Sequence, residues 1–345
     1  MPYTVSSSER TRSSGAEYET KALLYLMNFR DDSDEIHYFV VDFFNDLTGM
    51  DRFAENLWDV QSKGAKNNSP AAVGKALVTL FKNYLSDLNF ENLILFLGGV
   101  SSTVRVDSNL DVFGISNIKS SALTKLKEGL INEATDKTYI NNSNITDKNI
   151  NDFLQKVLFV IDNKSPSDYV KAIIKDHSAI IPEEQILKAI FNEIRNVQSE
   201  LKNTVVEGVV IQTSDEVLHY CRHLTNNEIR LMALNRIINR NPVEKNSVPP
   251  SFVPIYSSWP PEKQKDMLDQ CVQTLCKALF NKNAASEFWG LFENIYSLII
   301  NSPTSNVQEI YQEIDSELRN ASPDFDAVSL KYFIAVVKDG IQNDN

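Results

Sequence analysis

The stretch from Asp42 to Lys63, which reads DFFNDLTGMDRFAENLWDVQSK, constrains the fold of this chain more than any other segment. Its pattern predicts a strand, a turn and a second strand, and it ends in a glutamine and a lysine separated by one residue. Alternate side chains of a strand face the same side of a sheet. We therefore expect Gln61 and Lys63 to point together, away from Ser62, and the turn to bring Asp46 beside them.

A carboxylate, a second oxygen ligand and a lysine at one sheet end suit a Mg²⁺ site for phosphodiester hydrolysis. In this interpretation Asp46 supplies a charged oxygen ligand and Gln61 a neutral carbonyl oxygen. Lys63 would orient the attacking water and offset negative charge in the transition state. Glu19, in the first turn of a predicted helix at Gly15–Phe29, would add a contact to the metal or to its ligands.

The distribution of charge narrows the possible partners. The net charge of -12 argues against a general nucleic-acid coat protein, which would be basic overall. A nuclease is not excluded, because it needs positive potential only around its cleft. Between Gln61 and Ser86 there is no acidic residue, and the lysines there are Lys63, Lys66, Lys75 and Lys82. This window predicts a phosphate-binding face formed by the last three, with Lys75 and Lys82 on one side of a helix.

The N-terminal half alternates between helical and strand patterns, which predicts an α/β domain with a mixed sheet. The expected elements are a helix at Gly15–Phe29, a strand at Ile36–Phe44, a turn at Thr48-Gly49, a strand at Leu57–Lys63, a helix that starts at Ser69-Pro70 and continues to Leu85, and a strand at Leu93–Leu97.

Beyond Val100 the patterns are helical, and the C-terminal half is predicted to be an all-α domain. The expected helices lie at Ser120–Ala134, at Thr146–Ile161, from Ser165 to Ile174, from Pro182 to Leu201, twice across Asp215–Ile238, and at Glu262–Asn281, Ala284–Ile300, Val307–Arg319 and Asp324–Ile341. The patch from Thr204 to Ile211 fits a strand or an irregular link, and the prolines between Asn239 and Pro261 predict a long ordered connection. The expected division is a flexible arm at 1–14, an α/β domain at 15–176 and a helical domain at 177–345.

Nothing in the sequence suggests a membrane segment. No apolar run reaches the length of a membrane span, and the polar N-terminus lacks the apolar core of a signal peptide, so we expect a cytoplasmic protein. The cysteines, Cys221, Cys271 and Cys276, form no close pair and fit a reducing compartment. Buried thiols are expected, Cys271 above all, because it lies in an apolar helical pattern.

Three short motifs together resemble a known family. GAEYE (Gly15 to Glu19), DFFND (Asp42 to Asp46) and WDVQSKG (Trp58 to Gly64) resemble the PD-(D/E)xK nuclease pattern in its QxK form. More narrowly, they resemble the dsDNA endonuclease domain of bacterial anti-phage defence systems, of the type tied to CD-NTase signalling or to SMC-like Lamassu complexes. The resemblance covers roughly residues 13 to 175, including FLQKVLFVID (Phe153 to Asp162).

The resemblance implies a restriction-endonuclease-like fold and a role for each matching residue. Glu19 corresponds to the first-helix acid, Asp46 to the main metal ligand, Gln61 to the third position and Lys63 to the catalytic lysine. Glu19, Asp46 and Gln61 would hold Mg²⁺, for which Mn²⁺ would substitute. Two features depart from the pattern: Gln61 removes one charge from the metal shell, and Asp42 or Glu17 remain alternatives to Asp46 and Glu19.

The function implied is that of a metal-dependent dsDNA endonuclease, the effector of an anti-phage or anti-plasmid defence system. It would stay inactive until a partner, a ligand or oligomerisation activates it, and the helical domain would serve sensing or assembly. Because a double-strand cut needs two active sites, a homo-oligomer, either a dimer or a tetramer, is expected. Further partners implied are double-stranded DNA, an SMC-like subunit or a signalling nucleotide.

Other functions compete with this one. The nuclease-like domain would alternatively bind nucleic acid or protein without cutting, or serve as the inert head of a helical scaffold. His219 and His223 in HYCRH have the spacing of a zinc pair, but the sequence offers no third ligand nearby. Gly98-Gly99 follows a predicted strand without the lysine of a P-loop, and therefore indicates only a turn.

Overall fold

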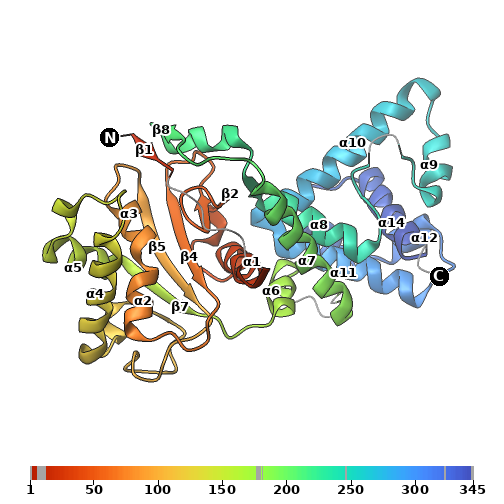
Figure 1. Ribbon diagram of the computed structural model, residues 1–345. Coiled ribbons are helices and arrows are strands. Elements are labelled where there is room, and N and C mark those ends of the chain that lie inside the picture. Colours follow the sequence, from red (N-terminus) through yellow and green to blue (C-terminus); the bar gives the residue numbers. More distant parts are fainter. Residues whose placement is uncertain are drawn as a thin grey trace. The chain divides into compact units, whose positions relative to one another are not determined.

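The computed structural model describes residues 2–5, 13–175, 180, 182–244, 247–321 and 324–342 (Figure 1). The chain divides into two compact units. The sheet unit comprises Met1–Ser165 and Ile194–Asn226, and the helical unit comprises Pro166–Glu193 and Asn227–Asn345. A mixed α/β region followed by a largely helical part is what the sequence predicts, and this coarse architecture is confirmed.

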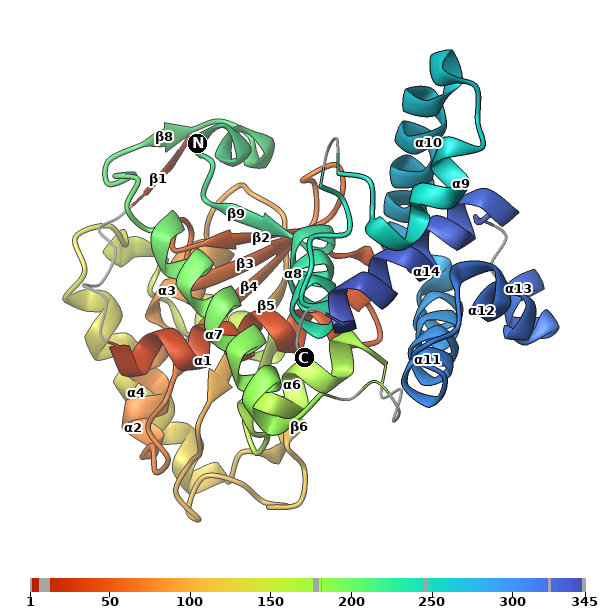
Figure 2. The same cartoon turned by 90° about the vertical axis from the view of Figure 1, so that its right-hand side faces the viewer.

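Within the described residues of the sheet unit, a seven-stranded sheet has the order β6-β7-β5-β4-β3-β2-β9 (Figure 2). Its strands are β2 (Tyr38–Val41), β3 (Leu47–Met50), β4 (Leu57–Lys63), β5 (Phe90–Leu97), β6 (Val112–Phe113), β7 (Val157–Ile161) and β9 (His223–Thr225). Strands β4, β5 and β7 are parallel to one another, and the remaining neighbours pair antiparallel. The predicted mixed sheet is confirmed.

The register of the parallel strands aligns their carboxyl ends. Lys63 at the end of β4 pairs with Leu97 at the end of β5, which in turn pairs with Ile161 at the end of β7. In open α/β sheets, functional groups gather outside this edge. The register therefore places the Gln61–Lys63 pair where a site is expected.

Helices cover both faces of the sheet (Figure 1). Helix α1 (Ser13–Asn28) packs on β3 and β4 from one side. The helices of the other side are α2 (Pro70–Ala76), α3 (Val78–Tyr84), α4 (Ser120–Thr135) and α5 (Asp147–Lys156). Ser69 caps α2 by accepting a hydrogen bond from the amide of Ala72, and Pro70 takes the first helical position, as the sequence predicts.

Helices α2 and α4 approach one another closely enough that their backbones touch. A Cβ atom built on Gly74 would lie 1.9 Å from the carbonyl oxygen of Leu126, and one on Gly129 would lie 2.3 Å from the carbonyl oxygen of Ala71. No side chain fits at either distance. The two glycines therefore set the spacing of this helix pair.

Three predicted elements differ in the structure. Thr48-Gly49 lies within β3 rather than in a turn, because the chain reverses earlier, at Asp42–Asp46, where Asp42 has a φ of 50°. The predicted helix at Thr146–Ile161 ends at Lys156, and its last five residues, VLFVI, form β7 between β5 and β6. The helix expected to continue to Leu85 is divided into α2 and α3 at Leu77.

The N-terminus and the segment 194–226 also depart from the expected division. Residues 2–5 of the predicted arm include β1 (Tyr3–Thr4), which pairs antiparallel with β8 (Val210–Ile211); positions 1 and 6–12 lie outside the described residues. Strand β9 pairs with β2, so part of the chain expected in the helical domain belongs to the sheet unit. Of the two helices expected across Asp215–Ile238, the first is a 3₁₀ helix (Ser214–Tyr220) followed by β9.

The helical unit has an apolar core of its own, separate from that of the sheet unit. The α-helices after β7 are α6 (Pro166–Ile173), α7 (Glu184–Leu201), α8 (Asn226–Ile238), α9 (Val253–Ser257), α10 (Pro261–Phe280), α11 (Ala285–Asn301), α12 (Val307–Glu313), α13 (Ser316–Ala321) and α14 (Ala327–Gln342). Short 3₁₀ helices lie at Ser33–Glu35, Ile115–Asn117, Asn142–Asn144, Pro250–Phe252 and Lys282–Ala284. None of the described helices has both the length and the apolar character needed to cross a membrane.

Candidate functional site

The candidate site lies at the carboxyl end of β4, beside the loop that joins β2 to β3. Asp46 immediately precedes β3, and the pairing of Leu47 with Val60 brings its carboxylate to the end of β4. There Asp46 Oδ2 accepts hydrogen bonds from Gln61 Nε2 at 2.6 Å, from the Ser62 amide at 2.8 Å and from Ser62 Oγ at 2.9 Å. The predicted approach of Asp46 to Gln61 is therefore present, and Ser62 adds a contact that the strand alternation did not reveal.

The two carboxylate oxygens of Asp46 differ in the hydrogen bonds that they accept. All three converge on Oδ2, whereas Oδ1 accepts no hydrogen bond from the described part of the chain. Burial raises the pKa of Asp46, and the nearby positive charge of Lys63 and the Ser62 donors oppose that rise. Asp46 is thus a firmly oriented carboxylate with one oxygen left for another ligand.

Lys63 lies close enough to Asp46 for their charges to interact, and its side chain is only partly buried. Its carbonyl oxygen accepts a hydrogen bond from the amide of Gly98 at 2.9 Å, which fixes the backbone at the end of β4. The next residue, Gly64, packs under the ring of Tyr18 from α1, and a Cβ there would lie 2.6 Å from that ring. The glycine after the lysine therefore lets α1 approach the site.

Glu19 reaches the same region from α1. Burial raises its pKa; the ion pair with Lys202 opposes this effect, and the carboxylates of Asp46 and Asp42 add to it. Because these charges interact, Glu19, Asp42 and Asp46 form one group, which we call the acidic cluster. Lys202 follows α7 directly, and sequence reasoning missed it because 183 residues separate it from Glu19.

The two acids that the sequence left as alternatives, Asp42 and Glu17, have different partners in the structure. Asp42 accepts a hydrogen bond from Arg222 at 3.1 Å, and burial raises its pKa against the charges of Lys202 and Arg222. Glu17 instead lies 3.5 Å from Lys21 one helical turn away, and Lys21 also pairs with Asp162 at 2.8 Å. Glu19 therefore contributes its charge to the acidic cluster, whereas Glu17 is engaged by Lys21.

A buried polar network lies beneath Asp46. Asp59, which shares a strand face with Gln61 and Lys63, accepts hydrogen bonds from Asn83 at 2.7 Å, from Thr48 at 3.2 Å and from Asn45 at 3.4 Å. Burial raises the pKa of Asp59 to about 7, and these donors only partly offset it. The same alternation that selected Gln61 and Lys63 includes Asp59, so the signal was available in the sequence.

The candidate phosphate-binding lysines do not lie on one helix. Lys66 follows β4, and Lys75 is on α2; both side chains are exposed. Lys82 is on α3, where its Nζ donates to the hydroxyl of Tyr3 and to the carbonyl oxygen of Thr4, each at 3.0 Å. The prediction that Lys75 and Lys82 share one side of a helix is wrong, because α2 ends between them at Ala76.

The histidines of HYCRH are not placed one helical turn apart on an α-helix. His219 lies in a 3₁₀ helix and His223 in β9, and Cys221 between them takes a left-handed conformation with a φ of 53°. Cys221 is exposed, whereas Cys271 is buried as expected, and burial raises the pKa of the Cys271 thiol to about 12.

The donor set of the acidic cluster suits a hard cation. Within the described residues, no three His, Cys, Asp or Glu side chains are grouped to hold a metal ion. Mg²⁺, however, usually keeps several waters and binds proteins through one or two carboxylates. The open oxygen of Asp46 and the nearby charge of Glu19 meet that requirement, and a cation would relieve the raised pKa values of both acids.

No protein-family model matches the chain, and comparisons with curated proteins and with solved structures gave no match either.

Proposed function

We propose that the protein is a metal-dependent endonuclease that hydrolyses phosphodiester bonds of double-stranded DNA. The observation that carries the proposal is the triple anchoring of Asp46 Oδ2 by Gln61 and Ser62, with Lys63 beside it. Such anchoring fixes a carboxylate for a ligand at its other oxygen. The resemblance of the three N-terminal motifs to the PD-(D/E)xK nuclease pattern supports the same activity.

The site residues divide the chemistry among them. Asp46 and Glu19 would hold Mg²⁺ or Mn²⁺, and the bound ion would lower the pKa of a water and neutralise phosphate charge. Gln61 holds Asp46 in place through its amide nitrogen, which leaves its amide oxygen as the atom that would face the ion. Lys63 would orient the attacking water and stabilise the negative charge that develops on the phosphate.

The ion pair between Lys202 and Glu19 supports a resting state of low activity. Both side chains are largely buried, with exposed fractions of 10% and 12%, so this ammonium adds to the positive charge that Lys63 and Arg222 bring to the acidic cluster. A divalent cation at Glu19 would compete with Lys202. Activation by a partner, a ligand or oligomerisation, as in a defence effector, would then consist of releasing this lysine.

Plasmid cleavage with Mg²⁺ or Mn²⁺, with and without candidate partners, tests the proposal. We expect Lys63→Ala and Asp46→Asn to lower the cleavage rate at least about a hundredfold, because each removes charge or orientation at the transition state. Lys125→Ala, which removes an exposed lysine on α4, is the matched control and should retain most of the activity. Equal cleavage by the wild type and by Lys63→Ala would refute the assignment.

Lys202→Met tests the proposed competition without relying on cleavage. Loss of the ammonium should tighten Mn²⁺ binding by about tenfold in calorimetry, a change of about 1.4 kcal/mol. Lys188→Met, which removes an exposed lysine on α7, is the control for a general loss of positive charge and should leave Mn²⁺ binding unchanged. Unaltered Mn²⁺ affinity in Lys202→Met would show that this lysine does not compete for the acids.

A second candidate function is binding of DNA or a protein without cleavage. The Lys202–Glu19 ion pair favours it, because a permanent internal cation would replace a metal. A metal titration distinguishes the two candidate functions directly, whereas the oligomeric state does so only indirectly. A protein that shifts DNA but neither binds Mn²⁺ nor cleaves in any assembly state would support this second function.

A further inference from the structure

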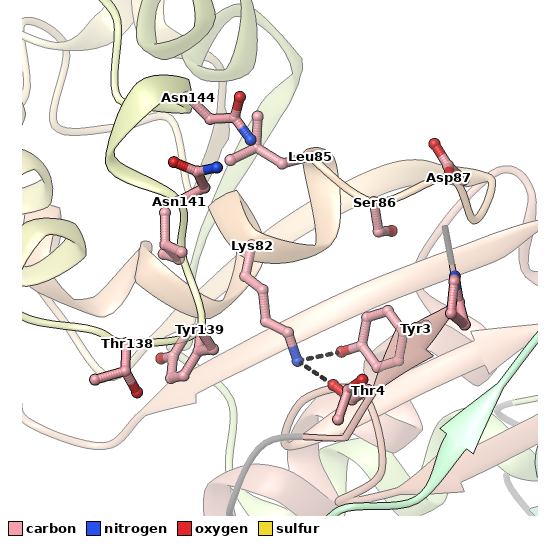
Figure 3. Close-up of a pocket in the computed structure, with 12 residues that line it drawn as sticks. Tyr3, Thr4, Lys82, Leu85, Ser86, Asp87, Thr138, Tyr139, Asn141 and Asn144 are labelled. Atoms are coloured by element: carbon pink, nitrogen blue, oxygen red, sulfur yellow. Dashed lines mark hydrogen bonds between the residues drawn. The ribbon is translucent and has the colours of Figure 1, made fainter.

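A pocket in the sheet unit lies away from the acidic cluster and has a volume of about 540 Å³ (Figure 3). It is bounded by β1, by the end of α3 and by the loop that precedes the 3₁₀ helix at Asn142–Asn144. Pockets of this size accommodate small organic ligands. The residues that line the pocket determine which class of ligand it would recognise.

Lys82 is the cation in the pocket lining. Its Nζ lies 4.2 Å from the ring centroid of Tyr3 and 5.4 Å from that of Tyr139, and it donates to the Tyr3 hydroxyl (Figure 3). Burial lowers the pKa of Lys82 to about 8, and the negative charge of Asp59 partly opposes this effect. The ammonium thus remains mostly charged at pH 7, in surroundings that strengthen its attraction for an anion.

Polar groups that can hydrogen-bond a ligand line the same pocket. Thr138, Asn141 and Asn144 line the pocket with hydroxyl and amide groups, whereas the hydroxyl of Ser86, also in the lining, donates to the carbonyl oxygen of Asn83 at 2.7 Å. The lining contains one acidic residue, Asp87, which is exposed and therefore screened by solvent. A partly buried lysine with neutral hydrogen-bond donors nearby suits the binding of an oxyanion.

A continuous chain of hydrogen bonds connects this pocket to the candidate site. The Tyr3 hydroxyl donates to Asn83 Oδ1 at 2.7 Å, and Asn83 Nδ2 donates to Asp59 Oδ2 at 2.7 Å. Asn45 Nδ2 donates to the same Asp59 oxygen at 3.4 Å, and Asn45 Oδ1 accepts from the backbone amide of Asp46 at 3.0 Å. The side chains between the two ends are buried, so water does not interrupt the chain.

We propose that this pocket binds a small molecule that carries a phosphate or carboxylate group, and that its occupancy is transmitted to Asp46 through Tyr3, Asn83, Asp59 and Asn45. A bound anion draws Lys82 toward itself and weakens its hydrogen bond to the Tyr3 hydroxyl. That hydroxyl, Asn83 and Asp59 then readjust, and Asn45 changes its hold on the Asp46 amide. The binding site stands independently of the nuclease; only an effect on cleavage rests on the proposed function.

The test is a titration of the full-length protein followed by ¹H–¹⁵N NMR, with inorganic phosphate, sulfate and acetate as separate probes. Amides of the pocket, such as Thr138 and Asn141, should shift together with the Asp46 amide, and the comparison of probes identifies the preferred oxyanion. Lys82→Gln should weaken binding at least about tenfold, because it removes a charge-assisted hydrogen bond. Lys125→Gln, which removes an exposed lysine on α4, is the matched control and should bind as the wild type does.

Tyr3→Phe separates binding from transmission, because it removes only the hydroxyl that links Lys82 to Asn83. We expect the pocket amides still to shift in this variant and the Asp46 amide to stay unchanged. A shift at Asp46 that persists in Tyr3→Phe would overturn the proposed route. Equal binding by Lys82→Gln and the wild type, or no binding of any probe, would overturn the site itself.

The pH dependence gives an independent check with sulfate, whose charge is constant in the relevant range. With a Lys82 pKa of about 8, sulfate should bind about tenfold more weakly at about pH 9 than at about pH 7. The titratable groups around Lys82 include Asp59, whose pKa is about 7, and Tyr3, whose pKa burial raises well above its usual value. Tyr139, whose ring lies 5.4 Å from Lys82 Nζ, and Asp87 of the pocket lining also face it. A sulfate affinity that does not fall across this range would exclude Lys82 as the anion ligand.

Discussion

Asp59 on β4 and Asp46 just before β3 show how hydrogen bonds distinguish a structural carboxylate from one available to a ligand. Asp59 accepts at both oxygens, from Thr48 at Oδ1 and from Asn83 and Asn45 at Oδ2. Asp46 accepts all its donors at Oδ2. A buried carboxylate bonded at both oxygens is satisfied internally. Asp59 therefore supports the site from below, whereas Asp46 presents an oxygen to it.

The raised pKa of Asp59 predicts how the stability of the folded protein changes with pH. Its pKa in the folded protein is about 7, against about 4 in an unfolded chain. The folded state therefore binds the proton more tightly, and stability from this group falls as pH rises from about 4 to about 7. Relative to the wild type, Asp59→Asn should thus gain about 2.5 kcal/mol in the free energy of unfolding between about pH 5 and about pH 8.

Urea unfolding of both proteins at the two pH values measures this gain. Taking the difference between variant and wild type removes the contributions of the other titrating groups, including the acidic cluster, to the pH dependence of stability. The absolute stability of Asp59→Asn will be lower at acid pH, because an amide NH₂ would face one of the existing donors. A difference that is the same at both pH values would show that Asp59 is already ionised at pH 5.

At the level of single elements, the sequence predicts best where a pattern is local. Strand β4 is found at Leu57–Lys63 as predicted, and α2 begins at Pro70 after the Ser69 cap. The run VLFVI was assigned to a helix, because a short, fully apolar segment has no periodicity that separates a buried strand from a helix. Its place between β5 and β6 depends on the rest of the sheet, which a local pattern does not contain.

The same limit applies to the candidate site. The proximity of Asp46 and Gln61 follows from two adjacent strands and was predictable. The contact of the Ser62 hydroxyl with the same Asp46 oxygen was not, because strand alternation points Ser62 away from Gln61 and Lys63. The cations Lys202 and Arg222 come from a segment that returns to the sheet unit after residues 166–193, which belong to the helical unit. No spacing rule connects them to Glu19 and Asp42. Their contribution is visible only in the folded chain.

The contact between α2 and α4 predicts a large effect from a very small substitution. Gly129→Ala adds one methyl group where the carbonyl oxygen of Ala71 lies 2.3 Å away, so the helices must separate. We expect a loss of about 2 kcal/mol in the free energy of unfolding, typical of overpacking, although alanine favours the helix itself. Urea unfolding of the variant and the wild type measures this loss of stability. Gly114→Ala, whose new Cβ would meet no atom within 4 Å, is the control; equal stability of both variants would contradict the close approach.

At the scale of the whole molecule, the sheet unit is discontinuous in sequence. Residues 194–226 supply β9, which covers the edge of β2, and β8, which pairs with β1. They also supply Lys202 and Arg222, the partners of two acids in the acidic cluster. The unit that carries the candidate site is therefore completed only after the chain has passed through α6 and the first part of α7.

This arrangement predicts that a chain ending at residue 176 does not form a stable sheet unit. Without β9 the backbone groups of β2 would form an open edge beside the buried residues Phe39, Val40 and Val41, and such edges promote aggregation. Glu19 and Asp42 would also lose their cations. A chain that ends at Asn226 retains all of these contacts. We expect size-exclusion chromatography and thermal unfolding to show a monodisperse, cooperatively unfolding protein for residues 1–226 and aggregation for 1–176. Cooperative unfolding of 1–176 at the same temperature as 1–226 would show that the returning segment adds nothing to the stability of the sheet unit.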